Sequence, residues 1–478
     1  MPALLVSGSS ISRQPVQRLL APLFLALALF ALPLQPASPA QRDSRPNIVV
    51  LMTDDQHVGS LSKMALTQQL IADQGTTFTN SFVSTPLCCP SRVTFLTGQY
   101  MHNHGVLSNS APDGGYWKLD HTNTLAVWLQ NAGYSTGFVG KYLNDYPFNR
   151  ADEIPPGYDF WVALASDWQY FNYTLNENGV LNVYPEDPQG ENYLTDVLAR
   201  RATSFIASRA SDPAPFFLWV AFLAPHTQLD LGLMGPTPAP RHAGAFAGEP
   251  LPQPPSFNEA DVSDKPSFIQ SLPSLDQATI ADLTTHHQKR LESLLAVDEA
   301  VSAIVDALAA AGKLDNTFLI FTSDNGYFHG EHRIVAGKSY QYEEALRVPL
   351  LIRGPGVPHQ TLGHLVVNVD LAPTIVQIAM ASSGRRMDGL SLLPLLQNPS
   401  LPWRRSFLIE GPQYRYLGVR TTSQVYLYHL TTHETEFYDL NVDPYQLESR
   451  PRPARPAEAG ALQQRLEQLR RCAGLACR

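Results

Sequence analysis

Two doublets of oxygen-bearing side chains lie far apart in the sequence, and each follows a short apolar run. The runs cover residues 47–53 and 317–322 and are typical of buried strands. The side chains that follow them are Asp54, Asp55, Asp324 and Asn325. Either doublet alone would be typical of exposed loop acids or helix caps. Because both follow buried strands, and because such oxygens suit a hard divalent cation, they predict a Ca2+ site.

A second group of reactive side chains is the segment Cys-Cys-Pro-Ser-Arg at 88–92, followed by Thr-Gly at 97–98. Adjacent cysteines do not easily bond to each other, so the tandem needs another explanation. The simplest is a buried thiol pair before a helix whose first turn holds Pro90. A Cys-x-Pro-Ser-Arg match is expected by chance in roughly one of several hundred chains of this length, given average residue usage. The segment therefore favours a chemical role.

The elements that must position these side chains alternate between strands and helices. Further buried strands are expected at 216–222 and 348–353, and helices at 124–132 and 292–311. This alternation favours an α/β domain in which helices flank a mostly parallel central sheet. Since ligands of such sheets bind beyond the carboxyl ends of the strands, both doublets are expected at one edge of the sheet.

Three parts of the chain are predicted: an export signal at 1–40, a catalytic domain at 41–395 and a small C-terminal α+β domain at 396–478. The signal has basic residues ahead of the apolar run 19–32, followed by small residues. A membrane anchor is the competing interpretation, but prolines break the run and it is shorter than the ~20 residues of a spanning helix. After signal cleavage no anchor is expected.

Two further segments complete this organisation. Residues 229–273 are rich in proline, glycine and alanine and predict a long surface insertion. The C-terminal part contains strand-like runs, among them 424–430, and a final helix at 457–471.

Composition excludes several classes of protein. The net charge of −9 and the pI near 5.9 argue against a general nucleic-acid binder, since phosphate backbones are bound mostly through lysine and arginine. An anionic substrate would need a local positive site. Four cysteines exclude a disulfide-framework protein. Cys472 and Cys477 are close enough in sequence to close a small loop in an oxidising compartment.

The segment at 88–98 resembles the signature of the type I sulfatases, Cys-x-Pro-Ser-Arg-x(4)-Thr-Gly. In that family a dedicated maturation enzyme oxidises the first cysteine to formylglycine (3-oxoalanine). The resemblance extends over nearly all of the chain beyond the signal. Its other motifs are Thr-Asp-Asp-Gln at 53–56, Gly-Lys-Tyr-Leu-Asn at 140–144, Ala-Pro-His at 224–226 and Thr-Ser-Asp-Asn-Gly at 322–326.

Within the family, the sequence looks closest to the N-acetylglucosamine-6-sulfatases and the heparan endosulfatases. The features that point to this subgroup are the double cysteine, Gly-Lys-Tyr-Leu-Asn, Met-His-Asn-His at 101–104, Tyr-Leu-Thr-Asp-Val at 193–197 and the final Cys-x(4)-Cys pair. The fold implied is that of alkaline phosphatase.

The resemblance implies a role for each reactive side chain. Hydrated formylglycine at Cys88 would be a ligand of the Ca2+ held by the doublets. One hydroxyl attacks the sulfur and the alcohol leaves, and the second hydroxyl then expels sulfate and restores the aldehyde. Arg92, one helical turn from Cys88, would bind the formylglycine and sulfate oxygens. Lys141 and Lys338 would hold the sulfate, and His226 would contact it or assist the leaving group.

The simpler alternatives for these residues are an exposed arginine, solvated lysines and a structural histidine. For His102, His104 and His329 a structural role is expected at least as much as a place in the pocket. Many sulfatases carry a histidine at the position of Leu143, so the leaving-group acid is left open. The stretch 410–420 is shorter than in the lysosomal glucosamine-6-sulfatase, which leaves the substrate open as well.

These observations predict a secreted or otherwise extracytoplasmic sulfuric ester hydrolase that acts on a sulfated carbohydrate, with the 6-O-sulfate of glucosamine favoured. Its partners are that carbohydrate and the maturation enzyme, with no nucleic acid. A phosphate or phosphonate monoester hydrolase of the same superfamily is one alternative. An inactive glycan-binding relative is another, although the nucleophile and all four metal-ligand positions are intact. Asn172 begins an N-glycosylation sequon whose use depends on the host.

Overall fold

The computed structural model describes residues 43–148, 150, 152–166, 168–187, 189–228, 233, 235–449 and 456–478. The predicted signal at 1–40, and with it the choice between signal and anchor, lies outside the described residues. Among the residues that are described, no helix combines the length and the apolar character needed to span a bilayer.

A ten-stranded sheet forms the centre of the described chain, in the order β11-β2-β10-β9-β1-β8-β4-β5-β6-β7. Its five middle strands β9, β1, β8, β4 and β5 pair in parallel, whereas β10, β6 and β7 run antiparallel to their neighbours. The bounds are β1 (Asn47–Thr53), β2 (Thr76–Phe78), β4 (Ser135–Gly140), β5 (Phe160–Leu164), β6 (Tyr173–Glu177), β7 (Val180–Tyr184), β8 (Phe216–Ala221), β9 (Thr317–Ser323), β10 (Leu350–Arg353) and β11 (Gln360–Leu362). The expected mostly parallel sheet is confirmed.

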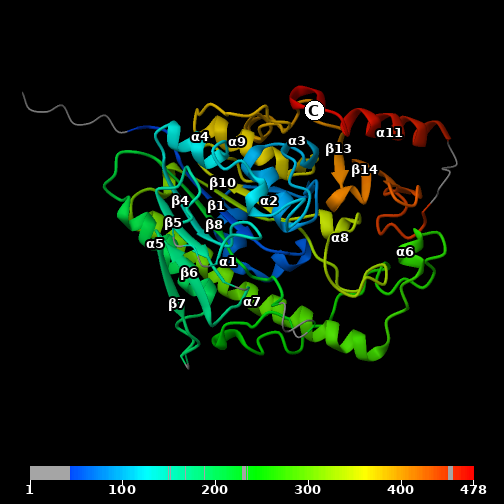
Figure 1. Ribbon diagram of the computed structural model, residues 1–478, viewed down its shortest axis with the longest axis horizontal. Helices are drawn as coiled ribbons and strands as arrows, with labels where there is room; N and C mark the ends of the chain where they lie inside the picture. The colour runs from blue at the N-terminus through cyan, green and yellow to red at the C-terminus, as the bar shows by residue number, and fades with distance from the viewer. Residues whose placement is uncertain are drawn as a thin grey trace, which may run out of the picture. The chain divides into compact units, whose positions relative to one another are not determined.

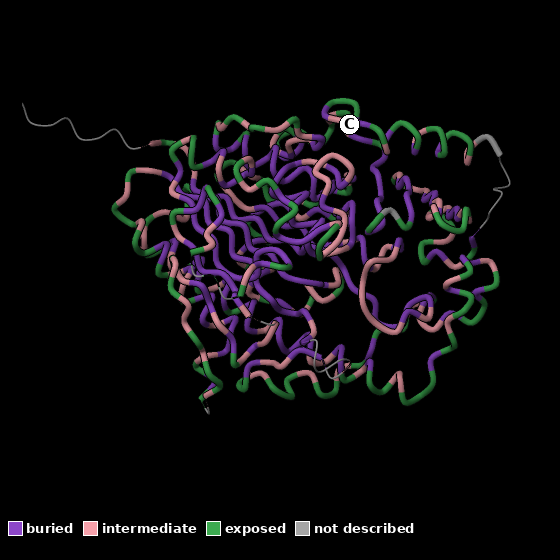
Figure 2. The backbone as a smooth tube through the Cα atoms, viewed as in Figure 1, coloured by how far each residue is buried: buried purple, intermediate pink, exposed green. Residues whose placement is uncertain are grey.

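Helices cover both faces of this sheet (Figure 1). One face packs against α2 (Cys88–Thr97), α4 (Leu125–Asn131) and α9 (Leu371–Ile378), and the other against α5 (Leu194–Ser208) and α7 (Gln277–Ala310). Strand β1 shows why: Ile48 and Val50 face the first group of helices, and Val49 and Leu51 face the second. Figure 2 shows the resulting concentration of buried residues in the sheet. An unbroken apolar run is what such a doubly covered strand requires.

Short elements connect these layers. They are α1 (Ala65–Thr67), α3 (Met101–His104), α6 (Ser267–Gln270), α8 (Glu343–Leu346), α10 (Leu393–Gln397) and the two-stranded pair β3 (Ser81–Phe82) and β12 (Val366–Val367).

Most expected elements form close to their predicted bounds. The predicted start of the helix expected at 292–311, however, was wrong. Helix α7 begins at Gln277, fifteen residues earlier (292 against 277). The side chain of Asp276 caps it by accepting a hydrogen bond of 2.8 Å from the backbone N–H of Thr279. The first turns are polar and partly exposed, so the sequence there lacks the apolar periodicity on which the prediction relied.

The C-terminal part forms a second, antiparallel sheet in the order β13-β14-β15-β16. Its strands are β13 (Ser406–Glu410), β14 (Tyr416–Thr421), β15 (Gln424–His429) and β16 (Thr435–Asp439), and helix α11 (Pro456–Leu469) packs on it through leucines that include Leu462 and Leu466. The expected small α+β unit is confirmed, and its predicted boundary at 395/396 stays a prediction.

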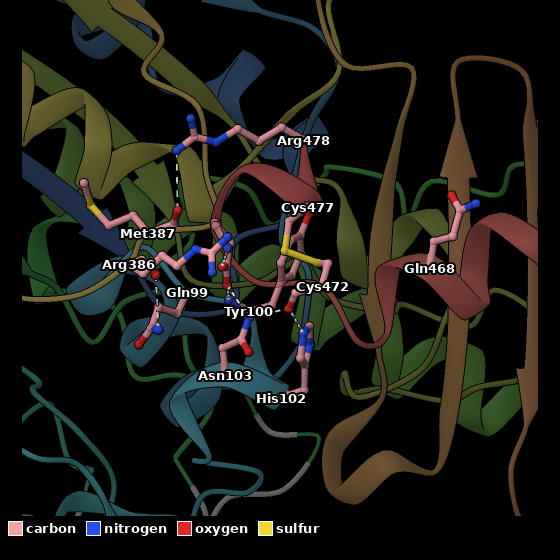
Figure 3. The surroundings of a disulfide bond; sticks show 12 residues. Gln99, Tyr100, His102, Asn103, Arg386, Met387, Gln468, Cys472, Cys477 and Arg478 are labelled. Atoms are coloured by element: carbon pink, nitrogen blue, oxygen red, sulfur yellow. Dashed lines mark hydrogen bonds between the residues drawn. A yellow bond between two sulfur atoms is a disulfide. The ribbon is translucent and has the colours of Figure 1, made fainter.

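The chain ends in a disulfide between Cys472 and Cys477, which the sequence allowed (Figure 3). The carbonyl oxygen of Cys472 accepts hydrogen bonds of 2.9 Å from His102 Nε2 and from Asn103 Nδ2. The backbone N–H of Gly474 donates to Asp388 Oδ1 at 2.6 Å. The disulfide loop is thereby attached to α3, directly after the helix that begins with Cys88.

His102 makes this attachment dependent on pH. Its Nδ1 donates to Glu410 Oε1 at 2.8 Å, so both ring nitrogens face acceptors and both need a hydrogen. Burial opposes the charge most strongly, but the hydrogen bond to Glu410, the charge of Glu410 and the hydrogen bond to the Cys472 carbonyl together outweigh it and raise the pKa of His102 above 6.5. The stabilisation is therefore complete below about pH 6.5 and is lost as pH rises through the raised pKa.

We expect the melting temperature of the wild type to exceed that of His102→Gln by more at pH 5.5 than at pH 9. Scanning calorimetry across this range measures the difference. The exposed His359→Gln variant is the matched control and should give no such trend. A gap between wild type and His102→Gln that is constant with pH would contradict the assignment.

Candidate active site

The pairing of β1 with β9 brings the two predicted doublets together. Thr53 lies opposite Ser323 in the parallel register, so the residues that follow both strands leave the sheet side by side. The backbone N–H of Asp55 donates to Asp324 Oδ1 at 3.0 Å, and Asn325 Nδ2 donates to Asp55 Oδ1 at 2.7 Å. Both doublets are buried, as the position beyond the strand ends predicts.

Cys88 is the first residue of α2 and points into this cluster. Its Sγ lies 3.6 Å from Asp54 Oδ1, 2.9 Å from Lys338 Nζ and 3.7 Å from Lys141 Nζ. The hydroxyl of Ser91 donates to the carbonyl of Asp324 and fixes the first turn of α2 against the end of β9. Burial raises the pKa of the Cys88 thiol to about 12, so the thiol itself is a poor nucleophile at neutral pH.

Arg92 joins the two doublets. Its side chain is fully buried, with Nη2 donating to Asp54 Oδ2 at 2.9 Å and Nε donating to Asp324 Oδ2 at 2.8 Å. Its Nη1 donates to the carbonyls of Lys141 and Tyr142. The guanidinium therefore sets the distance between β1, β9 and the loop after β4.

Two lysines complete the charge balance. Lys141 follows β4 and pairs with Asp54, and its Nζ lies 4.1 Å from the centre of the Trp168 ring. Lys338 pairs with Asp55. Burial disfavours the charged form of Asp54, yet Lys141 and the other nearby cations hold its pKa well below the ordinary range. Three carboxylates thus face three cations around Cys88.

His226 follows β8 and lies against Asp55. Its Nδ1 donates to the carbonyl of Thr227 at 2.6 Å, which leaves Nε2 facing Asp55 Oδ2 at 3.7 Å. Burial, helped by the charge of Lys141, lowers the pKa of His226 to about 3, so the ring is neutral at physiological pH. All the site residues expected from the sequence therefore lie in one cluster.

The donor groups fit a hard cation. Ligand atoms of Asp54, Asp55, Cys88 and His226 all lie within 4.8 Å of one another. Asn325 Oδ1 is buried and has no hydrogen-bond partner, a condition that costs free energy unless another group satisfies it. A bound cation would do so, and a donor set rich in carboxylate and amide oxygen suits Ca2+.

Asp324 differs from the other carboxylates. It belongs to the predicted ligand set, but its oxygens face Arg92 and the backbone of Asp55 here. Burial, together with the charge of Asp54, raises the pKa of Asp324 to about 6. A positive charge added beside it would favour its ionised form.

Two neighbours of the cluster were missed by the sequence analysis. Arg290 of α7 donates to the carbonyls of Pro225 and Asp55, and it lies in the half of the helix that was not predicted. The Trp168 ring contacts the ring of His226 edge-on, 4.9 Å between centres. No motif marks either residue. His104, for which a structural role was expected at least as much as a place in the pocket, contacts the hydroxyl of Thr94 at 3.1 Å.

Comparison with known proteins gives the following matches. Residues 46–381 match the family model named Sulfatase, and residues 330–471 match the model of the N-sulphoglucosamine sulphohydrolase C-terminal region. The human N-acetylglucosamine-6-sulfatase is 34% identical over 483 residues, which covers 91% of this chain and 86% of that protein. An extracellular sulfatase homologue of Caenorhabditis elegans is 37% identical over 384 residues, and the match covers 77% of this chain but only 53% of that relative.

A solved structure adds to these matches. A protein determined in complex with its substrate D-glucosamine-2-N,6-O-disulfate superposes with a TM-score of 0.72 at 25% sequence identity, covering 89% of this chain and 96% of the other.

Proposed function

This chain belongs to the sulfatase family, and from that premise we propose that it removes the 6-O-sulfate of a glucosamine-containing sugar, using Ca2+ and a formylglycine made from Cys88. Sulfuric ester hydrolysis is the activity of the family. The observation that carries the proposal is the convergence of Cys88, both doublets and two lysines in one buried cluster. The sugar is supported by the human relative's name and by the substrate of the structural neighbour.

Ca2+ would be held by the side-chain oxygens of Asp54, Asp55, Asp324 and Asn325, and it would supply the positive charge that draws an anionic ester into the site. Around Cys88 the protein pairs three carboxylates with three cations, and Arg290 lies beside Asp55 as a fourth cation. A divalent cation would add to the positive charge of this pocket, whereas the chain as a whole carries −9.

Formylglycine would supply an oxygen nucleophile at a position where the unmodified thiol is not ionised. Lys338 and Lys141 both contact that position, and in this proposal they hold sulfate oxygens. Residue 88 stands at the N-terminus of α2, where the helix dipole favours an anion. Arg92 keeps the two strand ends in register during the reaction.

His226 is the candidate group for assisting the departure of the sugar, because its ring lies against Asp55. Its neutral ring carries the hydrogen on Nδ1, so Nε2 is free to take the proton of an attacking hydroxyl and then to donate it to the oxygen of the leaving sugar. Leu143, at the position where many relatives have histidine, lines the adjoining cavity and offers no proton. We place the protein outside the cytoplasm, a location supported by its disulfide and by its extracellular relative.

Chelation tests the metal assignment. We expect EGTA to lower both the sulfatase activity and the melting temperature, because an ion bound only to the folded state stabilises it and because Asn325 Oδ1 is left without a partner when the ion is removed. Added Ca2+ should restore both, and Mg2+ should do so less well because it demands a tighter octahedral site. An unchanged melting temperature and activity in EGTA would contradict a resident metal.

Mass spectrometry of the peptide that carries Cys88 tests the nucleophile, using protein made in a host that contains the maturation enzyme. An aldehyde at residue 88 is expected, and a plain thiol there would favour the inactive glycan-binding alternative. Comparing the turnover of paired aryl sulfate and aryl phosphate substrates tests the remaining alternative, a phosphate or phosphonate monoester hydrolase. Dominant phosphate turnover would overturn the proposal.

A further inference from the structure

A cavity of about 370 Å3 adjoins the reactive cluster, a size within the ~300–1,000 Å3 typical of small-molecule sites. Its walls come from the segment after β4 and from the loop that carries Trp168. Lys141, which contacts Cys88 and Asp54, lies at its buried end, and Phe148 and Asp145 lie at its exposed end. The cavity is therefore the space next to the sulfur position in which the alcohol part of a substrate would lie.

The charges in this cavity are few. Among the described residues that line it, only Lys141 and Asp145 carry a charge; the others are polar, aromatic or aliphatic. Lys141 is committed to Asp54 and to the sulfate position. At Leu143 an apolar side chain stands where a histidine would add positive charge. The part of a bound sugar beyond the sulfate would therefore lie in the cavity with the Asp145 carboxylate as its charged neighbour.

The carboxylate of Asp145 is held in place by its surroundings. Its Oδ2 accepts a hydrogen bond of 3.2 Å from the backbone N–H of Ala111, and Ser110 Oγ lies 3.5 Å from Oδ1. Gly115, at φ 79°, makes room for it, since a Cβ there would lie 2.6 Å from Oδ2. Within the described part of the chain Asp145 has no lysine or arginine at ion-pair distance. A negatively charged side chain held in the wall of a site that binds anionic esters is unexpected and requires an explanation.

We infer that Asp145 excludes a second anionic substituent from the sugar in this cavity, so that the enzyme prefers a monosulfated amino sugar whose amino group is acetylated or free. This inference rests on the proposed function. An N-sulfate that enters the cavity is repelled by the Asp145 carboxylate, an acetamide is not, and an ammonium group is attracted. Between exposed charges that solvent screens, such a contact changes affinity by up to about fivefold.

The test compares kcat/KM for three substrates: glucosamine 6-sulfate, N-acetylglucosamine 6-sulfate and glucosamine-2-N,6-O-disulfate. The wild type should process the disulfate less efficiently than the N-acetyl substrate, by up to about fivefold. In Asp145→Asn this ratio should approach one. Asparagine retains the acceptor oxygen and tolerates the left-handed backbone of residue 145, at φ 61°, so the variant is expected to fold.

The matched control is Asp261→Asn, which makes the same change at an exposed carboxylate that also accepts a backbone N–H, that of Ser263. Its substrate ratio should equal that of the wild type. A wild type that prefers the disulfate, or an Asp145→Asn ratio equal to the wild-type ratio, would overturn the inference while leaving the proposed function intact. Failure of the wild type to process any of the three sugars would instead contradict the proposed function on which the inference depends.

Discussion

Cys88→Ala is expected to lower kcat/KM for sulfate-ester hydrolysis by about five orders of magnitude, the loss typical of removing a covalent nucleophile. The protein should still fold, because the change removes one sulfur atom and leaves the contacts among Asp54, Asp55 and the lysines in place. Steady-state kinetics on an aryl sulfate, together with a thermal melt, measure both effects.

Cys89→Ala is the matched control for this experiment. Cys89 is equally buried and is adjacent in sequence, but it packs in the core beneath α2 and its backbone N–H donates to Asn109. Its replacement should cost stability of about 1 kcal/mol and leave activity within a few-fold of the wild type. Comparable losses of activity in both variants would show that the tandem acts through packing, and would contradict a nucleophile at residue 88.

Arg92→Ala is expected to lower both stability and activity, by about 3–5 kcal/mol and by more than three orders of magnitude. The reason is that Asp324 would be left as a buried carboxylate without an ion-pair partner, and Asp54 would keep only its lysine partners. Arg92→Lys should not rescue the protein, because one ammonium cannot bridge two carboxylates and also donate to the carbonyls of the loop after β4. Denaturant unfolding and kinetics measure the two losses.

A second buried arginine separates structural from catalytic effects. Arg404 pairs with buried Asp370, away from the cluster around Cys88. Arg404→Lys should lower stability and leave kcat/KM on an aryl sulfate near the wild-type value. If Arg92→Lys likewise lowers stability but leaves kcat/KM near the wild-type value, Arg92 has only a structural role, and the role assigned to it in the active site is wrong.

The sequence predicts those parts of the fold in which consecutive residues are all buried, because burial then produces an unbroken apolar run. Strands β1 and β9 are covered on both faces, so each is an unbroken apolar run, and the doublets that follow them are visible at once. The first half of α7 carries no such pattern, since it is polar and contacts the rest of the protein through scattered residues such as Arg290. Its length follows from tertiary packing.

The same distinction applies to the site. The positions of Cys88 and Arg92 follow from a helix that begins at the cysteine and from the spacing of one turn. The closeness of His226 to Asp55 does not, because it depends on how the chain bends after β8. Trp168 belongs to a loop without a recognisable motif, and Asp145 follows the Gly-Lys-Tyr-Leu-Asn motif without being part of it, so only the folded chain places the two beside the reactive cluster.

The placement of β1 between β8 and β9 has a consequence for the order of synthesis. Asn47 of β1 meets a partner 169 residues later, at Phe216, and β9 is later still. While the nascent chain grows on the ribosome, β1 has no neighbours, and Asp324 and Lys338, which later enclose Cys88, do not yet exist. Cys88, which is inaccessible in the finished protein, is thus exposed throughout translation of these segments. Under the proposed conversion to formylglycine, this is when the modifying enzyme would reach it, and a molecule that folded first would have to unfold again.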